Sequence, residues 1–167
     1  MTIQSKMAFA LTLAVTLATV LPGPATAQLV SAERARATLE GTWRVAVTPR
    51  NCKTGAKVLP PFQSLLTFAE GGTATETTAN PLFFPSERGP GHGVWRRDGR
   101  QSYTAASIAL ITRNGALVET QTIEQTIEMQ SADLFYSKAT SEFSSPNGKH
   151  LATVCAIAVG RRYVLDR

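Results

Sequence analysis

Hydrophobic and polar residues alternate along most of the chain after residue 40. In the first such run, Trp43 and Val45 fall on one face of an extended chain, while Arg44 and Thr48 fall on the other. A period of two residues is the mark of a strand with one buried face. Eight runs predict strands at residues 41–48, 62–69, 73–78, 94–97, 101–112, 117–129, 134–143 and 151–163.

The links between these runs are mostly short and carry strong turn signals. Gly-Gly at 71–72, Asp-Gly at 98–99 and Asn-Gly at 114–115 are sequences typical of tight β-hairpins. Eight strands in simple up-and-down order can close into a barrel that leaves no exposed sheet edge. We therefore predict an all-β fold, an eight-stranded antiparallel up-and-down barrel with a short N-terminal helix at residues 31–39, capped by Ser31.

Residues 80–92 form the longest segment without a strand pattern, because they include three prolines and two glycines. Up-and-down order places this segment at the same end of the barrel as the loop at residues 50–61, and we expect that end to be the open mouth. Leu82, Phe83 and Phe84 are three consecutive apolar residues within the segment. They either cap the core or form a hydrophobic lid over the barrel interior.

Residues 1–27 have the pattern of a cleavable signal peptide. Lys6 precedes an uncharged apolar run, and small residues lead up to a cleavage site after Ala27. The run is shorter than the roughly 18 residues of a spanning helix, which makes an uncleaved anchor the weaker alternative. We expect residues 28–167 to form a single barrel domain that is periplasmic or secreted and has no membrane span.

Charge and composition argue against several functional classes. The chain has a net charge of +5, but its basic runs lack the interleaved aromatic residues of a nucleic-acid platform, so no nucleic acid is expected as partner. His92 and His150 are the only histidines, and neither has metal-ligand spacing. No phosphate loop or nucleophile elbow is present. We therefore expect no metal and no cofactor, and the glutamates on the strands, such as Glu124 and Glu128, to be outward charges.

The two cysteines test whether the barrel closes. Two cysteines in an exported protein are usually bridged, which predicts a disulfide between Cys52 and Cys155. Cys52 follows the first strand and Cys155 lies in the last, so the bridge requires these strands to be neighbours. If the cysteines lie directly opposite, paired residue numbers sum to 207 and Trp43 lies opposite Val164.

A Gly-x-Trp sequence at 41–43 opens the first strand, and two arginines lie near the end of the last. This combination resembles the lipocalin and wider calycin barrels. In such proteins a late arginine lies over the indole and closes the barrel base, which implies this role for Arg161 or Arg162 over Trp43. The lipocalin pattern does not require the second Gly-x-Trp, at 93–95. A barrel related to allene oxide cyclases or dirigent proteins is therefore an alternative.

The resemblance implies a barrel that binds a small hydrophobic molecule without catalysis. An enzyme of the cyclase or isomerase type is the alternative, and it would need a polar residue in the cavity. A structural envelope protein with a filled core is a third possibility, and the sequence leaves the oligomeric state open. The residues that we expect to line the pocket are Phe62, Leu66, Phe68, Phe83, Phe84, His92, Gln125 and Ile127.

Overall fold

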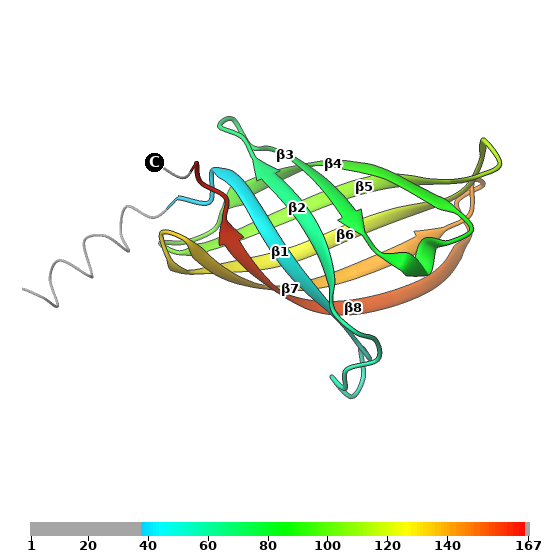
Figure 1. The fold of residues 1–167 in the computed structure, drawn as a ribbon, viewed down its shortest axis with the longest axis horizontal. Coiled ribbons are helices and arrows are strands. Elements are labelled where there is room, and N and C mark those ends of the chain that lie inside the picture. The colour runs from blue at the N-terminus through cyan, green and yellow to red at the C-terminus, as the bar shows by residue number, and fades with distance from the viewer. Residues whose placement is uncertain (1–37, 166–167) are drawn as a thin grey trace, which may run out of the picture.

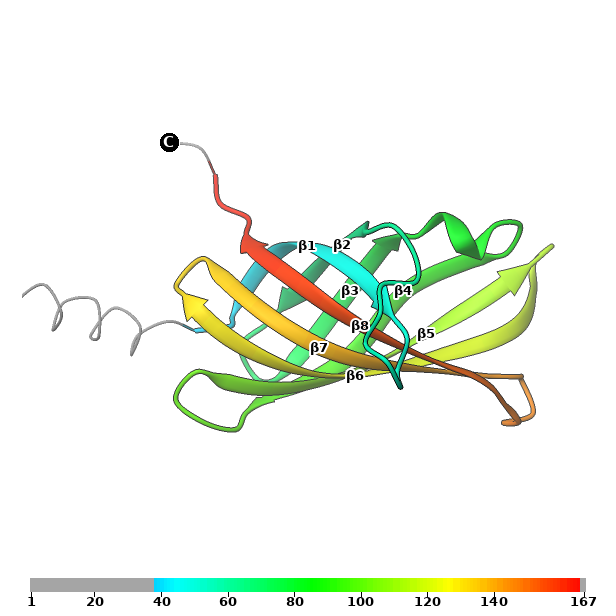
Figure 2. The same ribbon diagram turned by 90° about the horizontal axis from the view of Figure 1, so that it is seen from below.

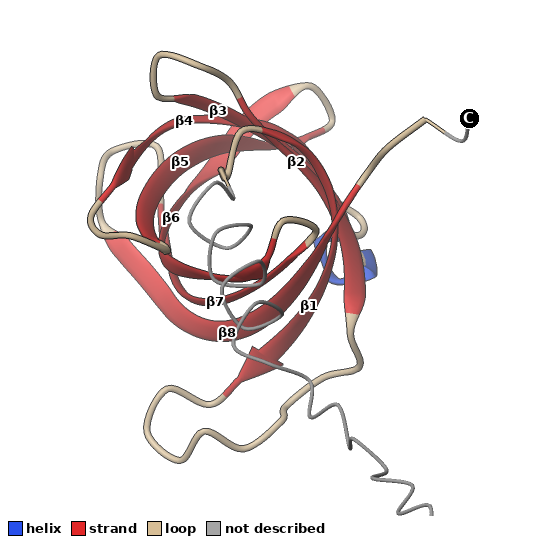
Figure 3. Cartoon of the chain, turned by 90° about the vertical axis from the view of Figure 1, so that its left-hand side faces the viewer, coloured by secondary structure: helices blue, strands red, loops and turns tan. Residues whose placement is uncertain are grey.

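The computed structural model describes residues 38–165 and folds them into a closed barrel of eight antiparallel strands (Figures 1 and 2). Each strand pairs with its neighbours in the sequence, and β1 pairs with β8, so the predicted up-and-down barrel is confirmed. Viewed from the left-hand side of Figure 1, the strands form a ring (Figure 3). The strands are β1 Gly41–Arg50, β2 Phe62–Phe68, β3 Thr73–Ala79, β4 Glu87–Arg97, β5 Ser102–Arg113, β6 Ala116–Ser131, β7 Leu134–Ser144 and β8 His150–Arg162.

Within residues 38–165, helical structure is limited to one short 3-10 turn. Most of the predicted helix at residues 31–39 lies outside the described residues, as does the predicted signal peptide, and residues 38–40 are not helical. The helical element within residues 38–165 is η1, a 3-10 turn at Pro81–Phe83. Asn80 caps it by accepting a hydrogen bond from the Leu82 backbone N–H at 3.1 Å, and a proline suits its first position. Within residues 38–165, no helix is long and apolar enough to cross a membrane.

Strand β4 is longer than predicted and begins at Glu87 instead of Val94. The prolines and glycines of residues 80–92 concealed this start. Pro90 can lie within the strand because the ladder between β4 and β5 shifts register between Arg88 and Gly91, leaving Pro90 unpaired there. The irregular segment is therefore confined to the residues around η1.

The seam between β1 and β8 closes the barrel with a register different from the expected one. Trp43 pairs with Arg162 and Arg50 with Cys155, so paired residue numbers sum to 205. The predicted register was wrong by two residues because Cys52 lies in the turn beyond β1. It reaches Cys155 at disulfide distance, with 5.1 Å between the Cα atoms, without lying directly opposite in the ladder. A shift of two residues keeps every side chain on its predicted face of the sheet.

The base of the barrel is closed by the indole of Trp43, which is fully buried. The guanidinium carbon of Arg162 lies 4.2 Å from the centre of the indole, and its neighbour Arg161 is exposed. Arg162 also donates hydrogen bonds to the backbone oxygens of Thr38 at 2.6 Å, Glu40 at 2.5 Å and Ala132 at 2.8 Å. This arginine therefore ties the segment before β1 and the β6–β7 turn to the base.

Gly41 of the Gly-x-Trp sequence is required by this arrangement. Its φ of +121° favours glycine, and a Cβ atom there would lie 2.7 Å from Nη1 of Arg162. The packed core lies around the indole at this end of the barrel. Its members are Leu39, Trp43, Val45, Leu66, Phe68, Tyr103, Ala105, Ile127, Met129, Phe135 and Ala158.

Candidate functional site

The other end of the barrel, which we call the mouth, contains a cavity of about 450 Å³. All eight strands and η1 contribute side chains to its wall. The interior is hollow here because six inward positions of β7 and β8 carry small residues that cannot fill an eight-stranded barrel. These small residues are Ser137, Ala139, Ser141, Ala152, Ala156 and Ala158.

Aromatic and aliphatic side chains form most of the cavity wall. Phe62 at the start of β2, Phe83 in η1 and Phe143 at the end of β7 lie around the mouth. The rings of Phe83 and Phe143 are 6.4 Å apart between centroids. Leu66 and Val45 lie deeper, where the cavity meets the packed base. Such a wall suits the apolar body of a small molecule.

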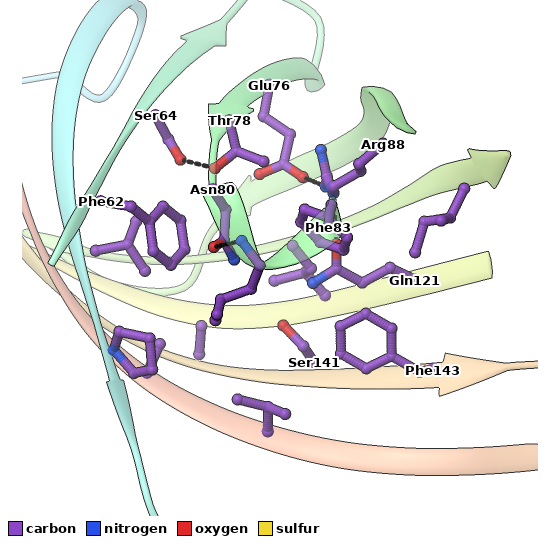
Figure 4. Close-up of a pocket in the computed structure, with 18 of the residues that line it drawn as sticks. Phe62, Ser64, Glu76, Thr78, Asn80, Phe83, Arg88, Gln121, Ser141 and Phe143 are labelled. Carbon is purple, nitrogen blue, oxygen red and sulfur yellow. Dashed lines mark hydrogen bonds and ion pairs between the residues drawn. The ribbon is translucent and has the colours of Figure 1, made fainter. Parts of the chain in front are cut away.

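A buried polar cluster interrupts this apolar wall (Figure 4). Arg88 of β4 forms an ion pair with Glu76 of β3, and the two side chains are 2% and 10% exposed. Its Nε donates a hydrogen bond to Oε1 of Gln121 on β6 at 2.5 Å, and its Nη1 donates to the backbone oxygen of Gly89 at 3.1 Å. Figure 4 shows these side chains pointing toward one another from three strands. A charged pair that is buried away from water needs several hydrogen-bond partners to offset its lost hydration.

Local geometry explains why Glu76 can reach into the barrel. Alternation along β3 places Glu76 and Thr78 on the inward face. Gly91 pairs with Glu76 across the sheet, and a Cβ atom at that glycine would lie 2.6 Å from the Glu76 carboxylate. The missing side chain therefore leaves room for the carboxylate. Thr78 accepts a hydrogen bond from the hydroxyl of Ser64 at 2.9 Å, which completes the polar side of this wall.

The opposite wall carries a second, uncharged set of polar groups on β6 and β7. Gln125, Ser137 and Ser141 line the cavity. Ser137 is 5% exposed, and its Oγ is one of two buried side-chain polar atoms without a hydrogen-bond partner within residues 38–165. The register pairs Ser137 with Ile127 and Ala158, so this hydroxyl lies at the inner end of the cavity, beside the packed base.

The residues predicted to line the pocket are divided between three places. Five of them line the cavity: Phe62, Leu66, Phe83, Phe84 and Gln125. Two others, Phe68 and Ile127, belong to the packed base core and do not line the cavity. Their strands were assigned correctly, but the position along the barrel decides whether an inward residue meets the cavity or the core.

His92 was placed wrongly at the mouth. It lies within β4, between Thr75 of β3 and Ile108 of β5, and its side chain is exposed on the outer surface. The error follows from the late predicted start of β4. The strand already includes residues 91 and 92, and the register shift between Arg88 and Gly91 sets their faces. Gly91 pairs with the inward-facing Glu76, so the next residue, His92, faces outward.

Sequence reasoning missed Glu76, Arg88 and Gln121. Alternation in the threonine-rich strand β3 could have revealed Glu76 on the inward face, and Gln121 follows the same face as Ile123 and Gln125. The inward position of Arg88 was not predicted, because the prolines and glycines around it show no strand pattern.

Other titratable groups lie away from the cavity. The pKa of Asp98 is lowered from its usual range, first by a hydrogen bond from the Thr104 hydroxyl and then by Arg96. Asp98 lies in the β4–β5 turn, at the base end of the barrel. Among residues 38–165, no group of three or more histidine, cysteine, aspartate or glutamate side chains could hold a metal ion.

Comparison with known proteins adds no closer assignment. No protein-family model matches the chain, and none of the curated proteins matches it. The closed eight-stranded antiparallel barrel is consistent with a calycin-like fold.

Proposed function

We propose that this protein is a lipocalin-like barrel, secreted or periplasmic, that binds one small hydrophobic molecule in the mouth cavity without catalysis. The observation that carries the proposal is the cavity of about 450 Å³ inside a barrel whose base is packed. Ligand pockets typically have volumes of about 300–1,000 Å³, with mostly apolar walls and a few polar groups. The pairing of Cys52 and Cys155 supports an oxidising compartment.

The small residues of β7 and β8 give the second support. A structural protein with a filled core would place large side chains at these inward positions, as the base does with Phe135 and Met129. Alanine and serine at six such positions instead leave a hollow with a mostly apolar wall. Transfer of an apolar molecule into this space removes its surface from water, which favours binding by about 25 cal/mol per Å² of apolar area.

A titration with N-phenyl-1-naphthylamine, an uncharged apolar fluorescent molecule, tests the proposal. Ala139→Phe places a ring in the cavity from β7, and Lys138→Phe places the same ring on the outer face of the same strand. We expect saturable binding of one probe to the wild type and to Lys138→Phe. We expect binding by Ala139→Phe to weaken at least about tenfold, because the ring occupies the space that the probe needs.

Two results would contradict the proposal. The first is no saturable binding by the folded wild type. The second is equal weakening in both variants, which would place the probe on the outer surface.

An enzyme of the cyclase or isomerase type is a second candidate, and the carboxylate of Glu76 inside the cavity is the observation in its favour. A positioned carboxylate can move a proton within a bound molecule. The test is to incubate a small molecule that binds in the cavity with the wild type and with two glutamate variants, and to analyse the recovered molecule chemically. Conversion that stops in Glu76→Gln and continues in Glu124→Gln, an exposed glutamate of β6, would establish catalysis. Recovery of an unchanged molecule in all three proteins favours simple binding.

A further inference from the structure

The polar groups of the cavity differ in what they can still offer to a ligand. The charged set, Arg88 and Glu76, is already paired and hydrogen-bonded. The uncharged set on β6 and β7 includes a buried hydroxyl, that of Ser137, without a partner. The chemistry of the ligand follows from this difference.

The charged set offers no net charge to a ligand. Three groups already accept hydrogen bonds from the Arg88 guanidinium, and one of them is the Glu76 carboxylate. An anionic ligand at this guanidinium would meet the negative charge of Glu76 in a poorly solvated site, where like charges repel strongly. The other charged residues of the wall, Arg113 and Glu119, also have opposite signs. The cavity therefore disfavours a carboxylate or phosphate group.

The uncharged set offers hydrogen bonds. Ser137 is 5% exposed, lines the cavity and lies at its inner end, next to the packed base. A buried hydroxyl without a partner destabilises the protein, and a ligand atom that pairs with it removes that penalty. A hydroxyl or carbonyl oxygen on the ligand can fill this role without bringing a charge into the cavity.

We infer that the ligand is an uncharged molecule with an apolar body and a hydroxyl or carbonyl group at its inner end, hydrogen-bonded to Ser137. The body lies against the phenylalanine side chains of the mouth, and the polar group enters first. This inference rests on the proposed binding function and names the chemical class of the ligand.

The exclusion of anions is tested by comparing two probes that share one ring system. N-phenyl-1-naphthylamine is uncharged, and 8-anilino-1-naphthalenesulfonate carries an added sulfonate. Only the part of the binding signal that is lost in Ala139→Phe is counted as binding in the cavity. We expect the wild type to bind the uncharged probe at least about tenfold more tightly than the sulfonate. Glu76→Gln leaves the charge of Arg88 uncompensated, so this preference should shrink about tenfold or more, while Glu124→Gln on the outer face should leave it unchanged.

The hydrogen bond to Ser137 is tested with Ser137→Ala. Displacement of N-phenyl-1-naphthylamine is measured for 4-phenyl-1-butanol and for butylbenzene, which lacks the hydroxyl. We expect Ser137→Ala to weaken binding of the alcohol about three- to tenfold and to leave butylbenzene unchanged. The melting temperature of the ligand-free variant should stay the same or rise, because an unpartnered buried hydroxyl has been removed. A merely structural serine would not separate the two ligands.

The outcomes distinguish this inference from the function on which it rests. Failure of the uncharged probe to bind in the cavity overturns both. Cavity binding of the uncharged probe with equal affinity for the sulfonate overturns the inference alone. Equal effects of Ser137→Ala on the alcohol and on butylbenzene overturn the assignment of the inner hydroxyl partner. The wild-type comparison and Ser137→Ala remain informative if Glu76→Gln does not fold.

Discussion

The base and the mouth of this barrel are built from the same alternating strands, yet one is packed and the other is hollow. At the base, inward positions carry Trp43, Phe135 and Met129, and the ring of Phe135 meets the indole edge-on at 4.9 Å between centroids. At the mouth, six inward positions of β7 and β8 carry alanine or serine. The size of the inward side chains therefore decides where an eight-stranded barrel is filled and where it has space for a ligand.

The two ends also hold the β1–β8 seam by different means. At the base, Arg162 lies over Trp43 and binds backbone oxygens from two segments. Toward the mouth, Cys52 and Cys155 join the seam from the turn after β1. The base thus depends on packing and charge-assisted hydrogen bonds, whereas the seam at the mouth depends on a covalent link.

The largest expected difference between the two ends is the effect of removing an aromatic ring. Trp43→Ala should lower the free energy of unfolding by about 3–5 kcal/mol, because the indole is fully buried and its removal leaves a cavity in the packed base. Phe143→Ala at the mouth should cost less than about half as much, because that ring is only partly buried beside a cavity. Urea unfolding measures both. Equal losses would mean that the mouth is as tightly packed as the base.

Removal of the disulfide should have the next largest effect. The Cys52→Ser/Cys155→Ser double variant should lose about 2–4 kcal/mol of stability, since the bridge closes a long loop, with a sequence separation of 103 residues. Thiol labelling of the unreduced, unfolded wild type should find no reactive cysteine. Two reactive thiols in protein from its own source would show that the bridge does not form there.

The two neighbouring arginines of β8 provide a matched test of the base. Arg162→Ala should cost about 1.5–3 kcal/mol, because it removes charge-assisted hydrogen bonds and the contact with the indole. Arg161→Ala should change stability by less than about 0.5 kcal/mol, because Arg161 is exposed. Thermal unfolding of the two variants measures the difference. A similar loss in both would indicate a general charge effect at the base.

The smallest expected effect on stability lies at the mouth. Leu82 and Phe84 are 58% and 86% exposed beside the cavity, so Leu82→Ser/Phe84→Ser should change stability by less than about 1 kcal/mol. The same change should weaken binding of N-phenyl-1-naphthylamine, because it removes apolar contact area from the cavity wall. Phe83→Ser is the comparison, since Phe83 packs toward Phe143 and should cost more stability. Unchanged probe affinity in the double variant would show that Leu82 and Phe84 are not a lid.

The sequence predicted the barrel because alternation and turn residues are local signals. Strands β5, β6 and β7 follow the predicted ranges closely, since Asn-Gly and similar turns fix their ends. The start of β4 was missed because Pro90 lies at a register shift, where the missing backbone N–H is tolerated. The β1–β8 register was missed because a disulfide from a turn does not specify a directly opposite pair.

The candidate site was predictable only in part. Alternation separates inward from outward residues, and on that basis Phe62 and Gln125 were placed in the cavity wall. It does not reveal the depth of a residue along the barrel, so Phe68 was assigned to the pocket although it belongs to the base. The pairing of Arg88 with Glu76 joins residues of two strands and depends on the absence of a side chain at Gly91, which only the folded chain shows.

Native mass spectrometry of the protein purified from its own source tests most directly whether the mouth cavity holds a small molecule. We expect one small molecule bound per barrel, released on unfolding as an uncharged compound and absent from Ala139→Phe produced in the same way. Addition of N-phenyl-1-naphthylamine to stripped protein provides the positive control. Bare protein from the natural source, under conditions that preserve the added probe, would contradict a natural ligand in the cavity. A molecule retained equally by Ala139→Phe would place it elsewhere on the protein.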